Sequence, residues 1–414
     1  MVSREQFLAV LKGESNEVIS WTMGFFDEKL ASALLGEDCI PSDILPGPEF
    51  SYGASPRQDW EVKAEYAKRA GIPAVAVGFG ASLAFGHGGP GEFLEKVISS
   101  AENRRITIYE TGVHKEVRYE PHFYHNYDYP LEDLSNLDLP FPDPGDPLRY
   151  QGLADEIAYH KGRDRMTYAN LNGFFSGVHY FLYPYDKFLM DLLLEPEATR
   201  EVVDRLGEYN LQVAEHLLKA GVDIICFCDD LGSDASLLIS PQLYREYFKP
   251  WHGRLVELCH KYGAFLHMHS HGNINPIMSD LYDLGIDMLN PIDPTEEMDI
   301  AQLVRDYGDE ITFVGGINKF FFDWDEQEQY AYLKKLYDSV DRGFFLMDSG
   351  GIPEQVSKSH WERFKEMKQV LGKERERSER GILGRICQGG YYTRGRRSYG
   401  RLCNEGSRRQ GVPR

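Results

Sequence analysis

Long apolar segments are missing from this chain of 414 residues. Its apolar runs are short and interrupted by glycine, proline or charge, and none approaches the ~20 residues that a bilayer crossing needs. Residues 1–5 are followed by no apolar segment of the kind that a secretory signal contains. We therefore expect a soluble, cytoplasmic protein with no membrane partner.

Cysteine is also scarce, with six residues in the whole chain. They are Cys39, Cys226, Cys228, Cys259, Cys387 and Cys403, and no two of them form a Cys-x-x-Cys pair. This spacing argues against a disulfide scaffold, a structural zinc knuckle and a thioredoxin-type redox site. We expect reduced thiols in a reducing compartment.

Positive charge is in short supply as well, because 45 Lys and Arg face 65 Asp and Glu, for a net charge of -20. The balance is uneven along the chain. Residues 372–414 hold 12 Lys and Arg and 4 Asp and Glu, a net of +8, which leaves -28 for residues 1–371. Nucleic-acid binding needs a basic face, so the composition argues against a nucleic-acid partner.

Eight short β-rich runs recur along the chain, and helical segments separate most of them. The runs are 18–25, 73–80, 165–175, 222–230, 264–271, 288–293, 311–318 and 343–350. Most are continuous apolar stretches, which is typical of parallel strands buried on both faces. Amphipathic segments at 197–220, 241–262 and 325–342 lie between them. This alternation predicts an α/β fold, a single (β/α)₈ TIM-type barrel.

Two segments depart from the barrel pattern. Residues 105–121 alternate apolar and polar side chains around Thr111-Gly112, which predicts an inserted β-hairpin. Residues 372–414 are rich in Arg, Gly and Ser and lack hydrophobic periodicity, which predicts a disordered basic tail. The expected organisation is a barrel domain over residues 1–371 and a tail over residues 372–414.

Three alternating histidines carry the strongest chemical signal. Side chains alternate along a strand, so His267, His269 and His271 share one face at intervals of roughly 7 Å. Gly272 ends the run, which places His269 and His271 at the carboxyl end, the catalytic face of barrel enzymes. Neutral imidazoles at this spacing can share one Zn²⁺ ion. We predict metal binding by His269 and His271 with His267, for which a hydrogen-bonded core position is the alternative.

Polar residues end several of the other runs. Asp229 and Asp230 follow one strand, and because adjacent side chains point to opposite faces, only one of them can look into the mouth. We predict a catalytic role for this pair in substrate contact, metal binding or proton transfer, with capping of the next loop as the alternative. Asn172, Asn318 and Asp348 end other runs and are predicted to bind substrate.

Several segments together resemble the uroporphyrinogen decarboxylase superfamily. They are DDLG (229–232), ISPQLY (239–244), HSHGN (269–273), GID (285–287) before LNP (289–291), GGI (315–317) and GGIP (350–353). The resemblance is collinear and spans roughly residues 2–371. It implies a (β/α)₈ barrel, and the superfamily includes decarboxylases of tetrapyrrole synthesis and cobalamin-dependent methyltransferases.

The two branches of the superfamily differ in what their pockets carry. The decarboxylase branch has an arginine-rich stretch after the first strand, whereas this chain has no arginine between Arg4 and Arg57. The methyltransferase branch resembles a zinc site made of a His-x-Cys pair and a later Cys. On that pattern His269 matches the histidine, His271 stands at the first cysteine, and the later cysteine falls at about Gly350. His269 and His271, completed by His267 or Asp348, would form a harder, more Lewis-acidic zinc site.

The resemblance and these departures favour a zinc-dependent corrinoid methyltransferase. It would move a methyl group from a small methylated substrate to or from a corrinoid that a partner protein supplies. One alternative is a uroporphyrinogen decarboxylase of tetrapyrrole biosynthesis. A second alternative is a non-catalytic subunit of a corrinoid system.

Overall fold

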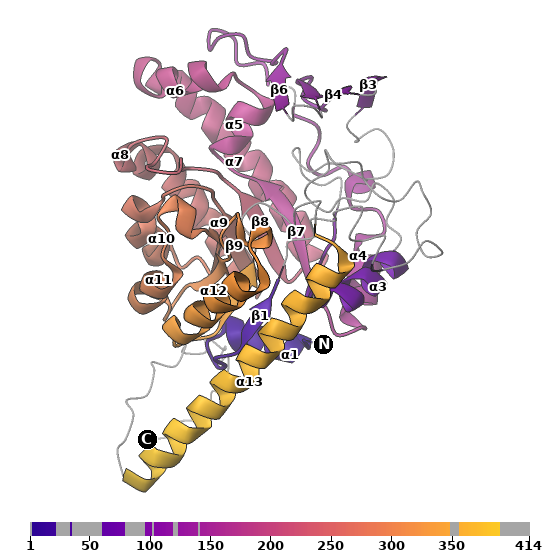
Figure 1. Ribbon diagram of the computed structural model, residues 1–414. Coiled ribbons are helices and arrows are strands. Elements are labelled where there is room, and N and C mark those ends of the chain that lie inside the picture. Colours follow the sequence, from indigo (N-terminus) through magenta and orange to yellow (C-terminus); the bar gives the residue numbers. More distant parts are fainter. Residues whose placement is uncertain are drawn as a thin grey trace, which may run out of the picture. The chain divides into compact units, whose positions relative to one another are not determined.

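The computed structural model describes residues 2–21, 34, 60–78, 96–101, 103–118, 123–139, 141–347 and 356–389 (Figure 1). The chain divides into two compact units, Met1–Gly372 and Lys373–Arg414. All the strands described lie in the first unit, and so does the candidate site.

Eight parallel strands form the central sheet of this unit. They are β1 (Val18–Ser20), β2 (Ala74–Ala76), β7 (Met166–Asn172), β8 (Ile224–Cys228), β9 (Phe265–His269), β10 (Met288–Ile292), β11 (Thr312–Gly316) and β12 (Phe344–Met347). Their order is β1-β12-β11-β10-β9-β8-β7-β2, and neighbouring strands pair in parallel. The eight predicted strands are confirmed. The sheet curls into an α/β barrel of the TIM type, whose described pairings leave β1 and β2 at the two edges.

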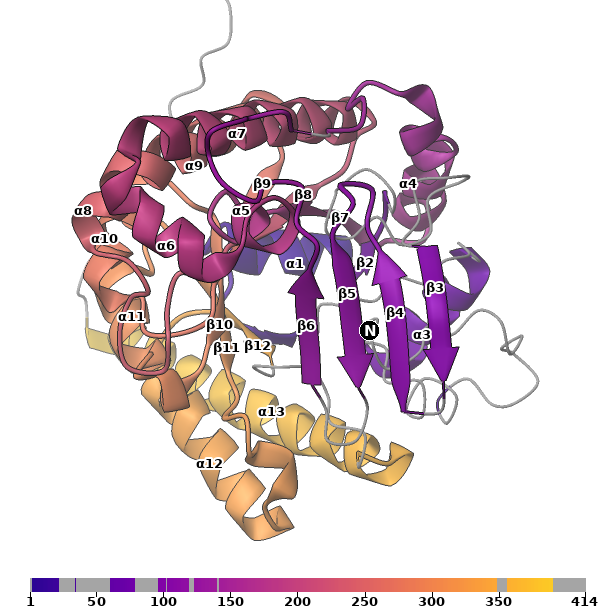
Figure 2. The same cartoon turned by 90° about the horizontal axis from the view of Figure 1, so that it is seen from above.

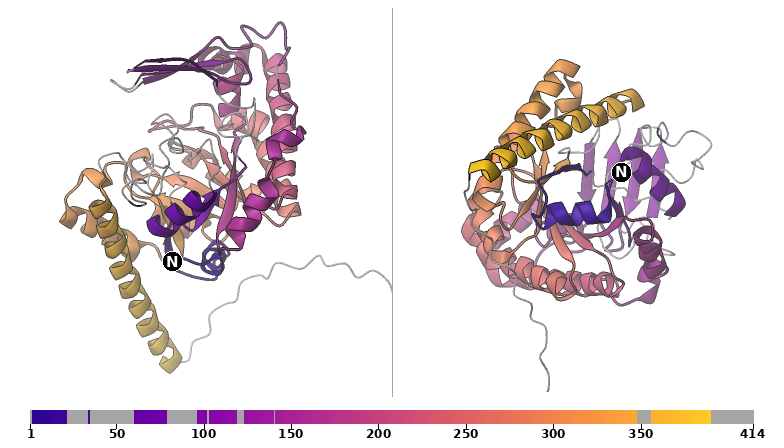
Figure 3. Two further views of the ribbon diagram at one scale, coloured as in Figure 1. Left: turned by 90° about the vertical axis from the view of Figure 1, so that its right-hand side faces the viewer. Right: turned by 90° about the horizontal axis from the view of Figure 1, so that it is seen from below.

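Helices follow the strands and surround the sheet, as the view from below in Figure 3 shows. They are α1 (Arg4–Leu11), α3 (Trp60–Ala70), α4 (Leu153–Lys161), α5 (Ser176–Phe181), α6 (Tyr185–Leu194), α7 (Pro196–Lys219), α8 (Pro241–Leu243), α9 (Lys249–Lys261), α10 (Met278–Leu284), α11 (Ile300–Tyr307), α12 (Glu326–Ser339) and α13 (Lys358–Gly389). A π-helical turn, η2 (Tyr244–Phe248), joins α8 to α9, and short 3₁₀ turns occur at Pro147–Tyr150, Asn275–Ile277, Pro294–Glu296 and Phe321–Asp323. Ser240 caps α8 by accepting a hydrogen bond from the Leu243 amide, with Pro241 at the first helical position.

Aromatic side chains fill the inside of the barrel. Trp21 follows β1 and its ring lies 5.6 Å from Tyr168 of β7, 5.8 Å from Phe345 of β12 and 4.8 Å from His267 of β9. Trp21, Tyr168, Phe345 and His267 are each at most 1% exposed. Since side chains alternate along a strand, these contacts place the even-numbered positions of β7 and the odd-numbered positions of β9 on the inward face.

A separate antiparallel sheet adjoins the carboxyl side of the barrel. Its strands, in order, are β3 (Lys96–Ala101), β4 (Arg104–Ile108), β5 (His114–Arg118) and β6 (Phe123–Tyr127). The predicted hairpin is confirmed as β4 and β5, and β3 and β6 extend it. Asn126 donates to the backbone carbonyl of Tyr180, which attaches β6 to α5 (Figure 2).

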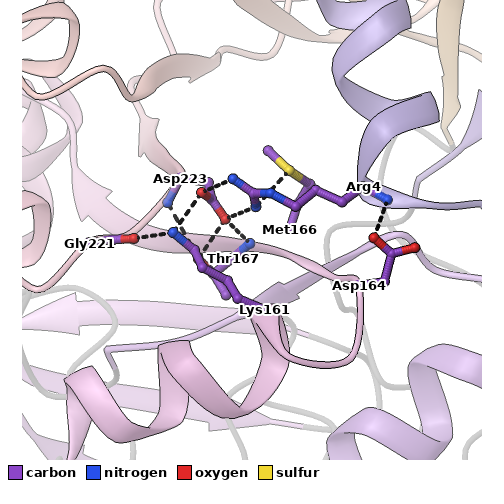
Figure 4. Close-up of polar contacts among 7 residues, drawn as sticks. All are labelled: Arg4, Lys161, Asp164, Met166, Thr167, Gly221 and Asp223. Carbon is purple, nitrogen blue, oxygen red and sulfur yellow. Dashed lines mark hydrogen bonds and ion pairs between the residues drawn. The ribbon is translucent and has the colours of Figure 1, made fainter.

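The amino end of the barrel carries a charged cluster of Arg4, Lys161 and Asp223 (Figure 4). The Arg4 guanidinium donates to both Asp223 oxygens at 2.5 and 2.6 Å, and Lys161 Nζ lies 2.8 Å from Oδ1. The Thr167 amide and hydroxyl donate to Asp223 Oδ2. The cluster joins α1, α4, β7 and the start of β8, on the face where barrel residues serve stability.

Helix α13 continues into the segment for which the sequence predicts disorder. It begins at Lys358 and ends at Gly389, and residues 390–414 lie outside the described part of the chain. Residues 373–380 are mostly Lys, Glu and Arg, which have high helix propensity. No helix among the described residues combines the length and the hydrophobicity that a membrane crossing requires.

Candidate active site

Four neighbouring strands end in one layer of polar side chains. Asn172 of β7 is the register partner of Cys228 of β8, Cys228 pairs with His269 of β9, and His269 pairs with Asn290 of β10. Register partners in parallel strands point the same way. The fold therefore brings an amide, a thiol, an imidazole and a second amide together at the carboxyl ends of the strands, where barrel enzymes hold their active sites.

Three of the side chains at this end offer ligand atoms that converge. The thiol of Cys228, a carboxylate oxygen of Asp230 and a ring nitrogen of His269 all lie within 4.8 Å of one another. Nε2 of His269 is 3.7 Å from Oδ1 of Asp230. A thiolate, a carboxylate and a neutral imidazole are the ligand types that zinc takes, so these residues could hold a divalent ion with a position left open. Cys228 was not among the predicted site residues, although its place just before Asp229 and Asp230 puts its thiol at the end of the strand.

His269 is held in a neutral state. It is 3% exposed, and its Nδ1 lies 3.1 Å from the side-chain amide of Asn290. Burial, and to a smaller degree the charge of His271, lowers the pKa of His269 to about 4, against the opposing effect of Asp230. The imidazole therefore has a lone pair available at neutral pH, as a metal ligand requires.

His271 has different surroundings. Its Nδ1 lies 2.9 Å from Oε1 of Glu296, whose other oxygen accepts from the Gly272 amide, and the His271 side chain is 32% exposed. Burial alone would lower the pKa of His271, but the hydrogen bond to Glu296 and the charges of Asp230 and Glu296 outweigh it and raise the pKa. Its ring centre is 4.9 Å from that of His269. No sequence pattern indicated Glu296, which lies in the 3₁₀ turn after β10.

His267 lies one layer deeper. Its register partners are Cys226 and Met288, it is fully buried, and its ring packs against Trp21. Burial lowers the pKa of His267 to about 3. The converging set of ligand atoms in the described residues contains His269 but neither His267 nor His271. The three predicted metal ligands thus have different surroundings. His267 lies in the core, His269 lies at the converging ligand atoms, and His271 is paired with a carboxylate.

The two adjacent aspartates have separate environments. Asp229 is fully buried, and its carboxylate accepts hydrogen bonds from the backbone amides of Phe174, Phe175 and Ser176, at 2.8 to 3.2 Å. Nε2 of His252 lies 2.8 Å from its Oδ2. Its oxygens are therefore engaged in holding the start of α5.

Asp230 is the more accessible carboxylate of the pair. Its side chain is 24% exposed, and its Oδ1 accepts from the His271 backbone amide at 2.9 Å. This hydrogen bond fixes the carboxylate beside His269. Of the two aspartates, Asp230 is the one placed to contact a substrate or a metal ion.

The predicted substrate-binding residues are spread more widely. Asn172 is 2% exposed in the layer described above, and neither atom of its side-chain amide has a hydrogen-bond partner among the described residues. Asn318, at the end of β11, accepts from the Phe320 amide with its side chain and so caps its own loop. Asp348 lies outside the described residues.

Aromatic side chains from α5 approach the acidic end of this layer. Burial, then the negative charge of Asp230, raises the pKa of Tyr180, so its phenol stays protonated. The neighbouring His179 is partly buried, and the desolvation of its ring lowers its pKa to about 4. Its ring lies 4.4 Å from that of Tyr180. Both side chains are therefore neutral at physiological pH.

Comparisons with known proteins agree with this architecture. Residues 170–368 match the family model described as Uroporphyrinogen decarboxylase (URO-D). Among solved structures, a methyltransferase from Methanosarcina mazei is similar, with 17% identity, a TM-score of 0.60, and coverage of 90% of this chain and 99% of that chain. A B12-independent methionine synthase from Shewanella sp. W3-18-1 in complex with selenomethionine has 13% identity, a TM-score of 0.45, and coverage of 89% and 98%. No curated protein matches the chain. The likeness to the methyltransferase shows the fold alone.

Proposed function

Because residues 170–368 belong to the uroporphyrinogen decarboxylase family, we propose that this chain is an enzyme of the family's methyl-transferring branch. It moves a methyl group between a small methylated substrate and a corrinoid, which a partner protein supplies. A divalent metal ion, zinc by the chemistry of the available ligands, takes part. The methyltransferase fold of the Methanosarcina mazei neighbour is consistent with this choice.

The observation that carries the proposal is the neutral His269 facing Asp230 at the carboxyl ends of β8 and β9. Its Nε2 lies 3.7 Å from Asp230 Oδ1, and burial lowers its pKa to about 4, so the nitrogen is a ready ligand. A metal ion bound there would act as a Lewis acid that polarises the oxygen carrying the methyl group. Asp230 would contact the substrate or the ion, while Asp229 holds α5 in place.

The charge of this mouth argues against the decarboxylase alternative. Asp230, Asp293 and Glu296 follow the ends of β8 and β10, and Lys319, after β11, lies 4.0 Å from the carboxylate of Asp234. A porphyrinogen carries many carboxylates, and these would meet the like charge of the partly exposed Asp230, with the buried Asp293 and Glu296 behind it. A small substrate without such charges avoids the repulsion.

Methyl transfer can be tested directly with the purified protein. We expect the zinc-loaded enzyme to transfer methyl groups from methoxylated aromatic compounds to cob(I)alamin. The change in corrinoid absorbance measures this reaction. His269→Ala should abolish turnover. His260→Ala, at an exposed histidine paired with Asp287 away from the strand ends, should leave it unchanged.

The same preparation distinguishes the alternatives. Release of CO₂ from uroporphyrinogen, with no methyl transfer, would replace our proposal with the decarboxylase. Binding of a corrinoid protein without turnover of either kind would indicate a non-catalytic subunit. Equal methyl-transfer rates for His269→Ala and the unaltered enzyme would remove the basis of the proposed site.

A further inference from the structure

We infer that Cys228 and Asp230 at the end of β8 join His269 of β9 as the protein ligands of one divalent metal ion. The ion is held by one sulfur, one oxygen and one nitrogen, not by the alternating histidines of β9. The inference rests on the proposed function for what the ion does in catalysis. Binding of the ion, however, is measured without any turnover.

One distance among the three side chains matches those around a tetrahedral ion, and the others are bounded. Ligand atoms 2.0 to 2.3 Å from zinc in a tetrahedral site lie roughly 3.3 to 3.8 Å from one another. Nε2 of His269 and Oδ1 of Asp230 are already 3.7 Å apart. All three ligand atoms lie within 4.8 Å of one another, at most about 1 Å beyond the tetrahedral range.

The backbone under these side chains is fixed by hydrogen bonds. Cys228 and His269 are register partners, and the Asp229 amide donates to the His269 carbonyl at 2.8 Å. Asp229 stands between the two β8 ligands, and its carboxylate is held by three backbone amides and by His252. The segment that carries Cys228 and Asp230 is therefore rigid before any ion binds, which favours metal binding.

Neighbouring groups orient two of the three ligands. The side-chain amide of Asn290 lies 3.1 Å from Nδ1 of His269. With the amide oxygen turned to that nitrogen, Nδ1 would donate and Nε2 would keep its lone pair toward Asp230. The His271 backbone amide fixes Asp230 through Oδ1. Hydrogen bonds that hold histidine and carboxylate ligands in place are a regular feature of protein metal sites.

A further observation points to a ligand at this layer. The side-chain amide of Asn172, register partner of Cys228, is 98% buried and neither of its polar atoms has a hydrogen-bond partner in the described part of the chain. Burying an amide without hydrogen-bond partners is unfavourable. A substrate bound at the open position of the ion would offer partners to Asn172 and offset this cost.

The other two of the three alternating histidines contact other groups. His267 sits one layer lower, beside Cys226 and against Trp21. His271 is engaged at Nδ1 by Glu296. A site made of the β9 histidines would contain no sulfur, whereas the site inferred from the converging atoms contains one, so spectroscopy can tell them apart.

The test uses the full-length protein loaded with Co²⁺, whose bond to a thiolate gives an intense charge-transfer absorption. We expect this absorption in the unaltered protein, its loss in Cys228→Ser, and its retention in Cys226→Ser, an inward position two residues earlier on the same strand. We expect affinity for Co²⁺ to fall by ~100-fold or more in Cys228→Ser and His269→Ala, and to change little in His267→Ala. Bound Co²⁺ without the absorption, or with an absorption that survives in Cys228→Ser, would overturn the inference.

A second measurement covers the case in which Cys228→Ser does not fold. Cys228 is partly exposed and forms no disulfide with a described residue. Zinc should protect it from alkylation by iodoacetamide, a chelator should restore the reaction, and peptide mass spectrometry would locate the modified residue. Equal alkylation of Cys228 with and without zinc would refute its role as a ligand. Zinc binding through Cys228 with no methyl transfer would refute the proposed function and leave the metal site standing.

Discussion

Replacing Asp229 should cost far more stability than replacing its neighbour Asp230. The Asp229 carboxylate is fully buried and accepts three backbone amide hydrogen bonds, from Phe174, Phe175 and Ser176. It also lies 2.8 Å from His252. Asp230 is 24% exposed and accepts one backbone amide hydrogen bond that the structure describes, from His271.

The size of the difference follows from these contacts. A hydrogen bond to a charged group contributes about 1.5 to 3 kcal/mol, and a buried donor left unpaired costs about 1 to 3 kcal/mol. Asp229→Asn keeps one acceptor oxygen but turns a donor toward the remaining amides, so we expect a loss of about 3 to 5 kcal/mol. Asp230→Asn keeps an acceptor near solvent, and we expect a loss of about 1 kcal/mol or less.

Guanidinium unfolding followed by tryptophan fluorescence measures both variants. If the unfolding free energy depends equally on denaturant concentration in all variants, the guanidinium midpoint of unfolding should fall clearly for Asp229→Asn and little for Asp230→Asn. Metal affinity should fall more in Asp230→Asn than in Asp229→Asn, because Asp230 is the proposed ligand and Asp229 only supports it. Midpoints that coincide for the two variants would refute the assignment of Asp229 to holding α5.

Three other predictions concern the surroundings of the site and the opposite face of the barrel. Burial tends to raise the pKa of Asp223, but hydrogen bonds from the cations of its cluster outweigh burial and lower the pKa below the ordinary 3.8. The stability that Asp223 contributes is therefore complete above about pH 4 and is lost as the pH falls through the folded-state pKa. Thermal unfolding between pH 2 and 6 should show a weaker loss of stability at acid pH in Asp223→Asn than in the unaltered protein. Gly272 has φ of +89°, and a Cβ there would lie 2.2 Å from the backbone of Gly232. Gly272→Ala should therefore lower the free energy of unfolding by about 3 kcal/mol. An unchanged melting temperature would contradict the close approach. Glu296→Gln removes a charge and weakens the hydrogen bond that raises the pKa of His271. NMR titration of the metal-free protein should therefore give a lower pKa for His271 in this variant. An unchanged His271 pKa would exclude the pairing with Glu296.

Much of the barrel could be predicted because its strands are buried on both faces. Apolar runs, most of them ending in glycine, asparagine, aspartate or histidine, marked the eight central strands, and each strand was observed within its predicted range. Strands β3 and β6 were missed because their side chains are largely polar or exposed, which weakens the period-two signal. Strand β4 and strand β5 were found because a glycine turn separates two alternating runs.

The candidate site was predictable only in part, because spacing along one strand says little about contacts between strands. The pattern identified His269 at the end of β9, but which of the three histidines meets Asp230 depends on the register of β8 against β9. Cys228 enters the set through that register. Glu296 reaches His271 from a loop 25 residues away in sequence, and no local pattern encodes such a contact.

Anomalous X-ray scattering at the zinc absorption edge, from crystals of the zinc-loaded protein, tests the central claim most directly. The account predicts one peak at the carboxyl ends of β8 and β9, within bonding distance of the Cys228 sulfur, an Asp230 oxygen and His269 Nε2. A peak bounded by His271 or His267 without Cys228, or no peak at these strand ends, would contradict it.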